Sequence, residues 1–186
     1  VSVKAMNGSS EEEIVLLAAS VEVASEHPLA AAIVNGAKER KITLLKATEF
    51  KSLTGRGITA TVNGKKIALG NQQLLIDQNI TADDVLKEVE SLQQEGQTVM
   101  FLVADEKVIG LLGVSDPIKE TSLEAIRDLE KEGVQVVMLT GDNRITAMAV
   151  AKKLGITQVE AGVLPERKNE VIKKLQSEGH IVAMAG

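Results

Sequence analysis

Residues 134–139 are a run of β-branched and apolar residues, apart from Gln135, that ends abruptly at a polar turn, residues 140–143. A continuous apolar run bounded by turn residues is typical of a strand that is buried on both faces of a parallel sheet. Residues 144–154 then place apolar or small side chains at helical spacing and stop at Gly155, which predicts a helix. The turn therefore lies at the carboxyl end of a strand, where open parallel sheets bind ligands. For an isolated junction of this kind, a turn with Asp142 as N-cap is the commoner interpretation.

The same alternation of strands and helices continues through the C-terminal part of the chain. It predicts helices at 119–131, 143–154 and 166–176, and strands at 134–139, 158–161 and 181–184. Strands that alternate with helices of this length indicate a doubly wound parallel sheet.

The N-terminal part has a different pattern, in which short strands are joined by tight turns. Asn63-Gly64 is a strong two-residue hairpin signal, and Asp105-Glu106 separates a second pair of strands. A capping box formed by Ser10 and Glu13 opens the first helix. The strands are expected at 1–5, 46–53, 58–62, 65–69, 98–104 and 107–113, and the helices at 11–23, 29–40, 72–77 and 83–94. We therefore predict an antiparallel sheet with flanking helices at 1–113, followed by part of a parallel α/β domain at 114–186.

Composition narrows the possible functions. The 186 residues include two Phe and no Tyr, Trp or Cys, and the formal net charge is −5. Few aromatic side chains and the lack of a basic stripe argue against a nucleic-acid partner. Without cysteine, and with two distant histidines, disulfides and a dedicated zinc site are not expected. There is no signal peptide and no apolar run of membrane-spanning length, and the chain resembles a piece of a longer protein.

Three clusters in the N-terminal part are suited to nucleotide chemistry. Glu26 and His27 precede a helix, and their carboxylate and imidazole match the donors and face of a purine, although such a pair is more often only the start of a helix. Gly55 and Gly57 let backbone approach a ligand, or else form a bulge. Asn71 follows a strand and by default belongs to a turn.

In the C-terminal part, Lys168 lies in the first turn of a predicted helix that follows a strand. It is thus expected at the same sheet edge as Thr140, Gly141 and Asp142, where an ammonium neutralises charge on a transferring phosphoryl group. A surface lysine is the ordinary alternative. The Walker and dinucleotide-binding glycine motifs are absent.

Taken together, the ordered motifs resemble the heavy-metal-transporting P-type ATPases. The resemblance covers essentially the whole chain and rests on Ser25-Glu26-His27-Pro28-Leu29, Thr54-Gly55-Arg56-Gly57, Gly70-Asn71, Asp116-Pro117, Thr140-Gly141-Asp142 and Pro165-x-x-Lys168. It implies a nucleotide-binding domain at 1–113 and the carboxyl part of a phosphorylation domain of haloacid-dehalogenase-like fold at 114–186.

The resemblance also implies roles for individual residues. Those surrounding the nucleotide would be Glu26, His27, Gly55, Gly57 and Asn71, with Asp116 at the hinge between the domains. Those facing the phosphoryl group would be Thr140, Gly141, Asp142 and Lys168. ATP is the implied ligand, and the implied parent pump, with membrane helices and an actuator domain, would place this chain on the cytoplasmic side of a membrane.

Two family segments are missing from these residues: the Asp-Lys-Thr-Gly-Thr motif that carries the phosphorylated Asp, and the Gly-Asp-Gly motif that holds Mg²⁺. We therefore expect the chain to bind ATP or ADP without turnover. A free-standing phosphatase with a cap domain, or a nucleotide sensor, are the alternatives. General similarity of residues 134–143 and 160–168 favours Cu⁺ as the transported ion, with Zn²⁺ or Cd²⁺ left open.

Overall fold

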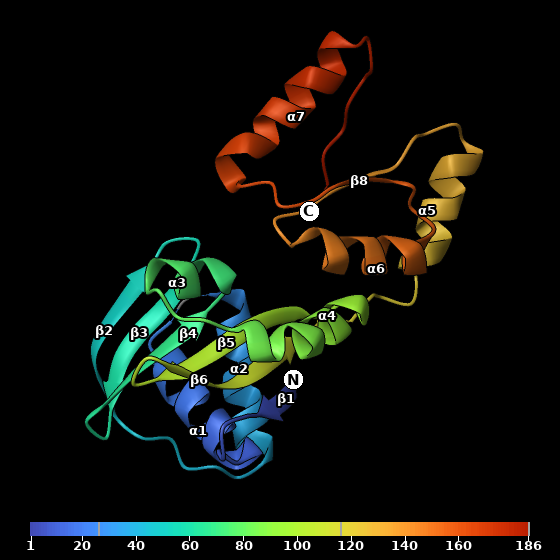
Figure 1. Ribbon diagram of the computed structural model, residues 1–186. Helices are drawn as coiled ribbons and strands as arrows, with labels where there is room; N and C mark the ends of the chain where they lie inside the picture. The colour runs from blue at the N-terminus through green and yellow to red at the C-terminus, as the bar shows by residue number, and fades with distance from the viewer. Residues whose placement is uncertain (26, 116, 186) are drawn as a thin grey trace. The chain divides into compact units, whose positions relative to one another are not determined.

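The computed structural model describes residues 1–25, 27–115 and 117–185, which pack as two units (Figure 1). The N-terminal unit consists of Val1–Gln93 and Gln97–Asp116, and the C-terminal unit of Gln94–Gly96 and Pro117–Gly186.

The N-terminal unit is built on a six-stranded antiparallel sheet with the strand order β1-β6-β5-β4-β3-β2. Two of its hairpins follow from local turn chemistry. Asn63 and Gly64 both have positive φ, and so do Asp105 and Glu106, which is the geometry that closes two-residue hairpins. The strands are β1 Ser2–Ala5, β2 Ala47–Leu53, β3 Gly57–Val62, β4 Lys65–Gly70, β5 Thr98–Ala104 and β6 Lys107–Val114.

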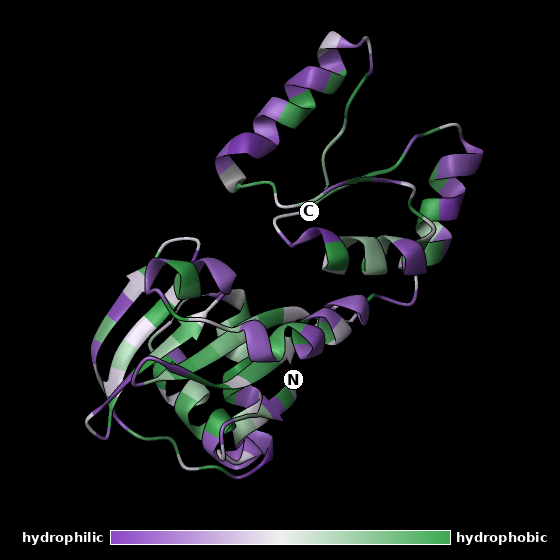
Figure 2. Ribbon diagram, in the orientation of Figure 1, coloured by the Kyte–Doolittle hydropathy of each residue, from purple (hydrophilic) through white to green (hydrophobic). Residues whose placement is uncertain are grey.

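Helices cover both faces of this sheet. On one face α1 (Glu11–Glu22) and α2 (Pro28–Glu39) enclose a core that includes Ile14, Ile33 and Leu69. On the other face α3 (Gln72–Asp77), the 3₁₀ turn η1 (Asp83–Val85) and α4 (Leu86–Gln94) pack on a second core that includes Leu74 and Phe101. The apolar positions of the strands between these helices appear as green bands in Figure 2.

Most helix boundaries of this unit agree with the sequence signals. Ser10 is the N-cap of α1, and its Oγ accepts a hydrogen bond from the Glu13 backbone N–H at 3.1 Å. One boundary differs, because the helix predicted at 83–94 begins as the 3₁₀ turn η1 and becomes α-helical at Leu86. Acidic residues in the first turn are compatible with the 3₁₀ turn and with the α-helix, because both present unpaired backbone N–H groups at their start.

At one edge of the sheet, β2 is interrupted by a bulge. Its register against β3 shifts between Thr48 and Lys51, and Glu49 between them has a φ of 55°. The carboxylate of Glu49 accepts a hydrogen bond from the Thr61 hydroxyl at 2.7 Å, which holds the bulge in place.

The C-terminal unit contains a parallel pair of strands, β7 (Val137–Leu139) and β8 (Gln158–Glu160), connected through α6 (Arg144–Leu154). Its other helices are α5 (Ser122–Lys131) and α7 (Pro165–Ser177). A strand–helix–strand unit with parallel strands is the repeating unit of a doubly wound sheet. The predicted fold class, an antiparallel sheet with helices followed by part of a parallel α/β domain, is thus confirmed.

Several predictions for this unit were wrong in detail. Residues 181–184 form no strand, because a strand exists only where a neighbouring strand accepts its backbone hydrogen bonds. Ile181 in this segment is fully exposed. The run 134–139 is extended only at Val137–Leu139, and these residues are half-buried rather than buried on both faces. In the described residues β7 pairs with β8 alone, which leaves its other edge uncovered. The helix predicted from residue 119 begins at Ser122.

No helix within the described ranges combines the length and the apolar content that crossing a membrane requires.

Candidate functional site

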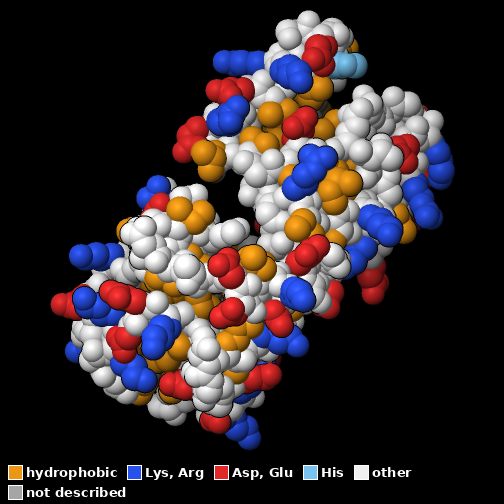
Figure 3. All heavy atoms as spheres, in the orientation of Figure 1, with side chains coloured by type: hydrophobic (Ala, Val, Ile, Leu, Met, Phe, Trp, Pro, Cys, Tyr) orange, Lys and Arg blue, Asp and Glu red, His pale blue; other side chains and the backbone are white. Residues whose placement is uncertain are grey.

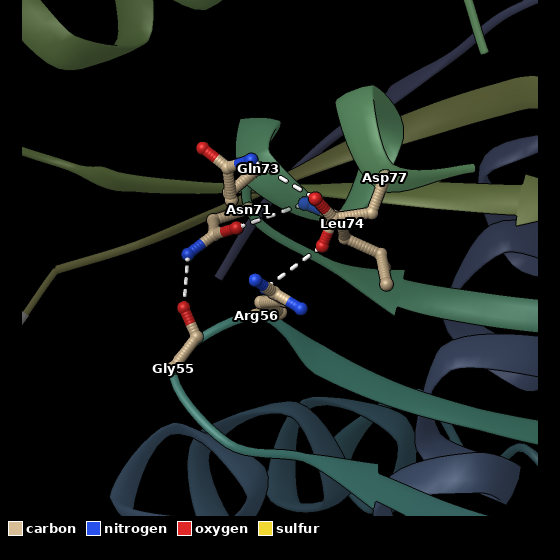
Figure 4. A network of polar contacts seen from close by, with 6 residues as sticks. All are labelled: Gly55, Arg56, Asn71, Gln73, Leu74 and Asp77. Atoms are coloured by element: carbon tan, nitrogen blue, oxygen red, sulfur yellow. Dashed lines mark hydrogen bonds and ion pairs between the residues drawn. The ribbon is translucent and has the colours of Figure 1, made fainter. Parts of the chain in front are cut away.

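The turn between β2 and β3 is joined to helix α3 by a network of polar contacts (Figure 4). Asn71 is the N-cap of α3, since its Oδ1 accepts a hydrogen bond from the Leu74 N–H at 3.2 Å. Its Nδ2 donates to the Gly55 carbonyl at 2.8 Å, and its backbone N–H donates to the Arg56 carbonyl at 2.8 Å. The structure therefore brings together Gly55, Gly57 and Asn71, three of the residues predicted to surround a nucleotide.

The two glycines of this turn have different reasons to be glycine. At Gly57 a Cβ would lie 2.2 Å from the Leu69 carbonyl oxygen, because β3 and β4 approach closely where Gly57 faces Gly70. At Gly55, whose φ is 70°, a Cβ would meet nothing within 4 Å. Gly57 is thus explained by packing inside the sheet, whereas Gly55 presents open backbone on the surface of the turn.

His27 begins helix α2 as its N-cap. Its Nδ1 accepts a hydrogen bond from the Leu29 backbone N–H at 3.2 Å, so the neutral ring carries its proton on Nε2. The side chain is exposed. An exposed imidazole in a fixed tautomer offers one donor and one open ring face to a ligand.

Sequence reasoning missed Glu22, the last residue of α1, which the structure places in the same cluster. Glu22 is only 2% exposed, and its Oε2 has no hydrogen-bond partner among the described residues. The Ser25 hydroxyl connects it to His27, because Ser25 bonds the Glu22 carboxylate and accepts from the His27 N–H at 3.2 Å.

Burial raises the pKa of the Glu22 carboxyl, and the hydrogen bond from Ser25 and the charge of His27 oppose that rise. A buried carboxyl oxygen without a donor is uncommon in folded proteins and calls for an explanation. An amine of a bound ligand is a donor of the required kind.

The remaining two predicted residues of this group, Glu26 and Asp116, lie outside the described residues. In the part of the chain that is described, no hydrogen bond or ion pair joins the Glu22–His27 cluster to the turn at Gly55. The α2 N-cap His27 and the α3 N-cap Asn71 belong to helices that cover opposite faces of the sheet.

In the C-terminal unit, the predicted turn after β7 is closed by its own side chains. The Thr140 Oγ1 donates to the Asp142 Oδ2 at 3.0 Å and accepts from the Asp142 backbone N–H at 3.1 Å. The N-cap of α6 is Asn143 rather than Asp142, since the Asn143 Oδ1 accepts from the Thr146 N–H at 3.0 Å. Asp142 is thus not used as a cap, and Gly141 is exposed beside it.

A second segment lies against this turn and leads to Lys168. The Gly162 N–H donates to the Asp142 carbonyl at 2.7 Å, and the Val163 N–H donates to the Thr140 carbonyl at 3.0 Å. Helix α7 begins directly afterwards and has Lys168 in its first turn. Lys168 is half-buried and forms no ion pair with another described residue. The structure thus joins the Thr140–Asp142 turn to the start of the helix that carries the predicted cation.

Metal ligands do not gather anywhere in the described ranges, which contain no group of three or more His, Asp or Glu placed to hold an ion. The N-terminal cluster offers hydrogen-bond donors and an oxygen acceptor, which suit an organic base, and the turn of the C-terminal unit offers a hydroxyl, exposed backbone and a nearby cation, which suit a phosphate group.

The family model and the sequence relatives that match this chain agree with one another. Residues 3–186 match the family model described as haloacid dehalogenase-like hydrolase. The chain is 47% identical over 176 residues to a copper-transporting P-type ATPase of Rhizobium leguminosarum bv. viciae, and 40% identical over 181 residues to a silver-exporting P-type ATPase of Salmonella typhimurium. These matches cover 95% and 97% of this chain but only 21% and 22% of the relatives, so the chain spans about a fifth of their length.

The fold agrees with the sequence relatives. A crystal structure of a zinc-transporting PIB-type ATPase in the E2·Pi state matches with a TM-score of 0.66 and 34% identity, over 96% of this chain and 28% of that one. The chain therefore belongs to the haloacid dehalogenase-like hydrolase family, and within it resembles the heavy-metal-transporting P-type ATPases.

Proposed function

We propose that this chain is the nucleotide-binding part and a portion of the phosphorylation part of a heavy-metal P-type ATPase. In this proposal the N-terminal unit binds ATP and the C-terminal unit handles its γ-phosphoryl group. The parent pump hydrolyses ATP through an aspartyl-phosphate, while this chain alone binds ATP or ADP without turnover. The domain limits proposed from the sequence, 1–113 and 114–186, are supported by the separate packing of the two units.

The observation that carries the proposal is the buried carboxyl of Glu22 beside His27. Its Oε2, which has no partner among the described residues, needs a donor, and the exocyclic amine of adenine supplies one without bringing a second charge into the site. The exposed imidazole of His27 stacks on the base or donates to one of its ring nitrogens through Nε2. Adenine then provides most of the recognition, and Gly55, Gly57 and Asn71 form the backbone wall along the ribose and phosphates.

The C-terminal residues are proposed to receive the phosphoryl group. Thr140 and the exposed backbone of Gly141 form a small polar cradle, and Lys168 supplies the cation that offsets charge on the transferring oxygens. Asp142 shapes this cradle through its bonds with Thr140.

We propose that this chain supplies only part of the binding site for the magnesium that phosphoryl transfer requires. Asp142 is the carboxylate of the turn, and the described residues contain no group of three or more His, Asp or Glu that could hold an ion. We therefore assign the main Mg²⁺ ligands to parts of the parent protein outside these residues. The membrane helices and the actuator domain of the proposed pump are likewise assigned to other parts of the parent protein.

For the transported ion we propose Cu⁺, because the named relatives include a copper-transporting and a silver-exporting pump. Monovalent copper and silver share a preference for soft ligands, whereas a zinc-transporting pump shares the fold at lower identity. Transport of Zn²⁺ or Cd²⁺ is the alternative within the same family.

The proposal is tested by calorimetric titration of the chain with ATP and ADP. His27→Ala should weaken both by roughly 1–3 kcal/mol, since one stacked or hydrogen-bonded group is lost. Lys38→Ala is the matched control, because it removes an exposed side chain from the same helix, α2, at a position with no proposed role and should leave both affinities unchanged. If His27→Ala binds ATP as the unaltered chain does, adenine recognition does not take place at this cluster.

A further inference from the structure

Arg56 lies in the middle of the turn between β2 and β3 and contributes the one charged side chain of Thr54-Gly55-Arg56-Gly57. Its Nε forms an ion pair with the Asp77 Oδ2 at 2.7 Å (Figure 4). The other oxygen of Asp77 accepts from the Gln73 Nε2 at 3.0 Å. The carboxylate that holds Arg56 is therefore itself held by helix α3.

The position of Asp77 is electrostatically unfavourable by itself. It is the last residue of α3, and a carboxylate at a helix C-terminus faces the negative end of the helix dipole. Arg56 offsets this, so that α3 is tied to the turn at both of its ends: through Asn71 at its start and through Asp77 at its end. The guanidinium is consequently kept in one place beside the open backbone of Gly55.

This arrangement leaves most of the guanidinium available. Arginine carries five N–H donors in a planar fork, and the ion pair to Asp77 uses only the Nε donor. The Arg56 side chain is 50% exposed, whereas that of Asp77 is 30% exposed. Planar guanidinium donors are well matched to phosphate oxygens.

Residues 1–116 carry a net negative charge, so a polyanion needs a nearby cation in order to bind to this part of the chain. Residues 1–116 contain eleven Lys or Arg and sixteen Asp or Glu. A nucleoside triphosphate that approaches this surface meets net repulsion unless a nearby cation offsets it.

We propose that Arg56 binds the phosphate chain of the nucleotide, with Asp77 as the positioning residue that holds the guanidinium in the turn. The inference rests on the proposed function, in that it assigns the phosphate end of the same nucleotide site. It makes the affinity for ATP, unlike that for adenosine, depend on a cation at position 56 in particular.

The test is calorimetric titration of the chain with ATP, ADP and adenosine. Arg56→Gln should weaken ATP about tenfold, as expected for a charge-assisted hydrogen bond at an exposed site, and adenosine less than twofold. Lys51→Gln is the matched control, because it removes an exposed positive charge from the adjacent strand β2 and should leave both ligands unaffected. Rising salt should reduce the difference between Arg56→Gln and the unaltered chain.

The exchange variant Arg56→Asp/Asp77→Arg separates phosphate binding from a role in holding the turn. It restores an ion pair between turn and helix but moves the cation to the helix, so ATP affinity should stay low. Recovery of ATP affinity in this variant, or equal losses for ATP and adenosine in Arg56→Gln, would overturn the inference. Should Arg56→Gln fail to fold, Arg56→Lys keeps the charge and should retain more ATP affinity than the exchange variant. Absence of ATP binding by the unaltered chain would instead overturn the proposed function.

Discussion

The two units support their candidate residues by different means. In the N-terminal unit the turn at Gly55 is tied to α3, and α3 is anchored by Leu74 and Leu75, which are 0% and 1% exposed. In the C-terminal unit α5 has no buried residue, and apolar side chains remain visible on the surface (Figure 3). Large apolar residues at least 38% exposed in that unit are Ile118, Leu129, Val134, Ile145, Met148, Leu164, Ile181 and Met184.

This difference shows that a site can be ordered by a core or by local hydrogen bonds. The N-terminal turn depends on Asn71 and Asp77, which lie at the two ends of α3, a helix anchored in a core on one face of the six-stranded sheet. The turn at Thr140–Asp142 is instead closed by contacts within three residues and by two backbone bonds from residues 162 and 163. Disruption of packing should therefore act much more strongly on the first unit than on the second.

The largest effect should come from emptying the core of the N-terminal unit. Leu102 is 0% exposed, so Leu102→Ala should lower the free energy of unfolding of that unit by about 2–5 kcal/mol, through lost burial and the cavity that remains. The equivalent change in the other unit, Leu129→Ala, removes a side chain that is 46% exposed and should cost less than about 0.5 kcal/mol.

Hydrogen exchange resolved by peptide measures the two units separately, as the chain has no tryptophan or tyrosine to report on them. A loss of protection in both units on Leu102→Ala, equal in size, would contradict the comparison.

A second, smaller effect should separate the two glycines of the N-terminal turn. Gly57→Ala places a Cβ against backbone of the neighbouring strand, which cannot move aside as a side chain can, and should destabilise the unit by about 1–3 kcal/mol. Gly55→Ala has space for the Cβ and meets only the cost of a positive φ, about 1 kcal/mol. Urea unfolding monitored by circular dichroism compares them, and equal losses would show that the turn, not the sheet, requires both glycines.

The smallest effect should be a change in the pH dependence of stability at Glu22. Its pKa is raised above the ordinary value of 4.5, so the folded chain holds a proton that the unfolded chain has released. That stability is fully present below about pH 4.5 and is lost as the pH rises through the raised pKa of the folded chain. Glu22→Gln should therefore be more stable than the unaltered chain at neutral pH and equally stable in acid.

Thermal melting across that pH range measures this difference, with the exposed Glu12→Gln on the same helix as control. A Glu22→Gln chain that is less stable at neutral pH would show that the carboxylate has a partner that stabilises it.

What the sequence predicted well is what neighbouring residues decide. Asn63-Gly64 closes a hairpin through its own backbone preferences, and Ser10 caps α1 through a bond to the third residue beyond it. Predictions of this type need no knowledge of the rest of the fold. The connection of Asn71 to Gly55, sixteen residues away, was expected only from the resemblance to a family.

The features that sequence reasoning missed depend on distant partners. Glu22 looks like an ordinary polar residue at a helix end, and only the packing of α1 against the sheet makes it buried. The run 181–184 has the composition of a strand, but a strand needs a neighbour that no local pattern reveals. For the same reason, the close approach of β3 and β4 that explains Gly57 was not readable from a Gly-x-Gly motif.

The bulge in β2 has a consequence for how the chain behaves in concentrated solution. β2 is a terminal strand of the sheet, and an open terminal strand presents backbone groups that can recruit a strand from another molecule. The left-handed residue Glu49 breaks that row of groups in its middle, and Lys51 beside it adds a charge that an incoming strand would have to bury. The hydrogen bond from the Thr61 hydroxyl to Glu49 should therefore hinder edge-to-edge strand pairing, and with it aggregation.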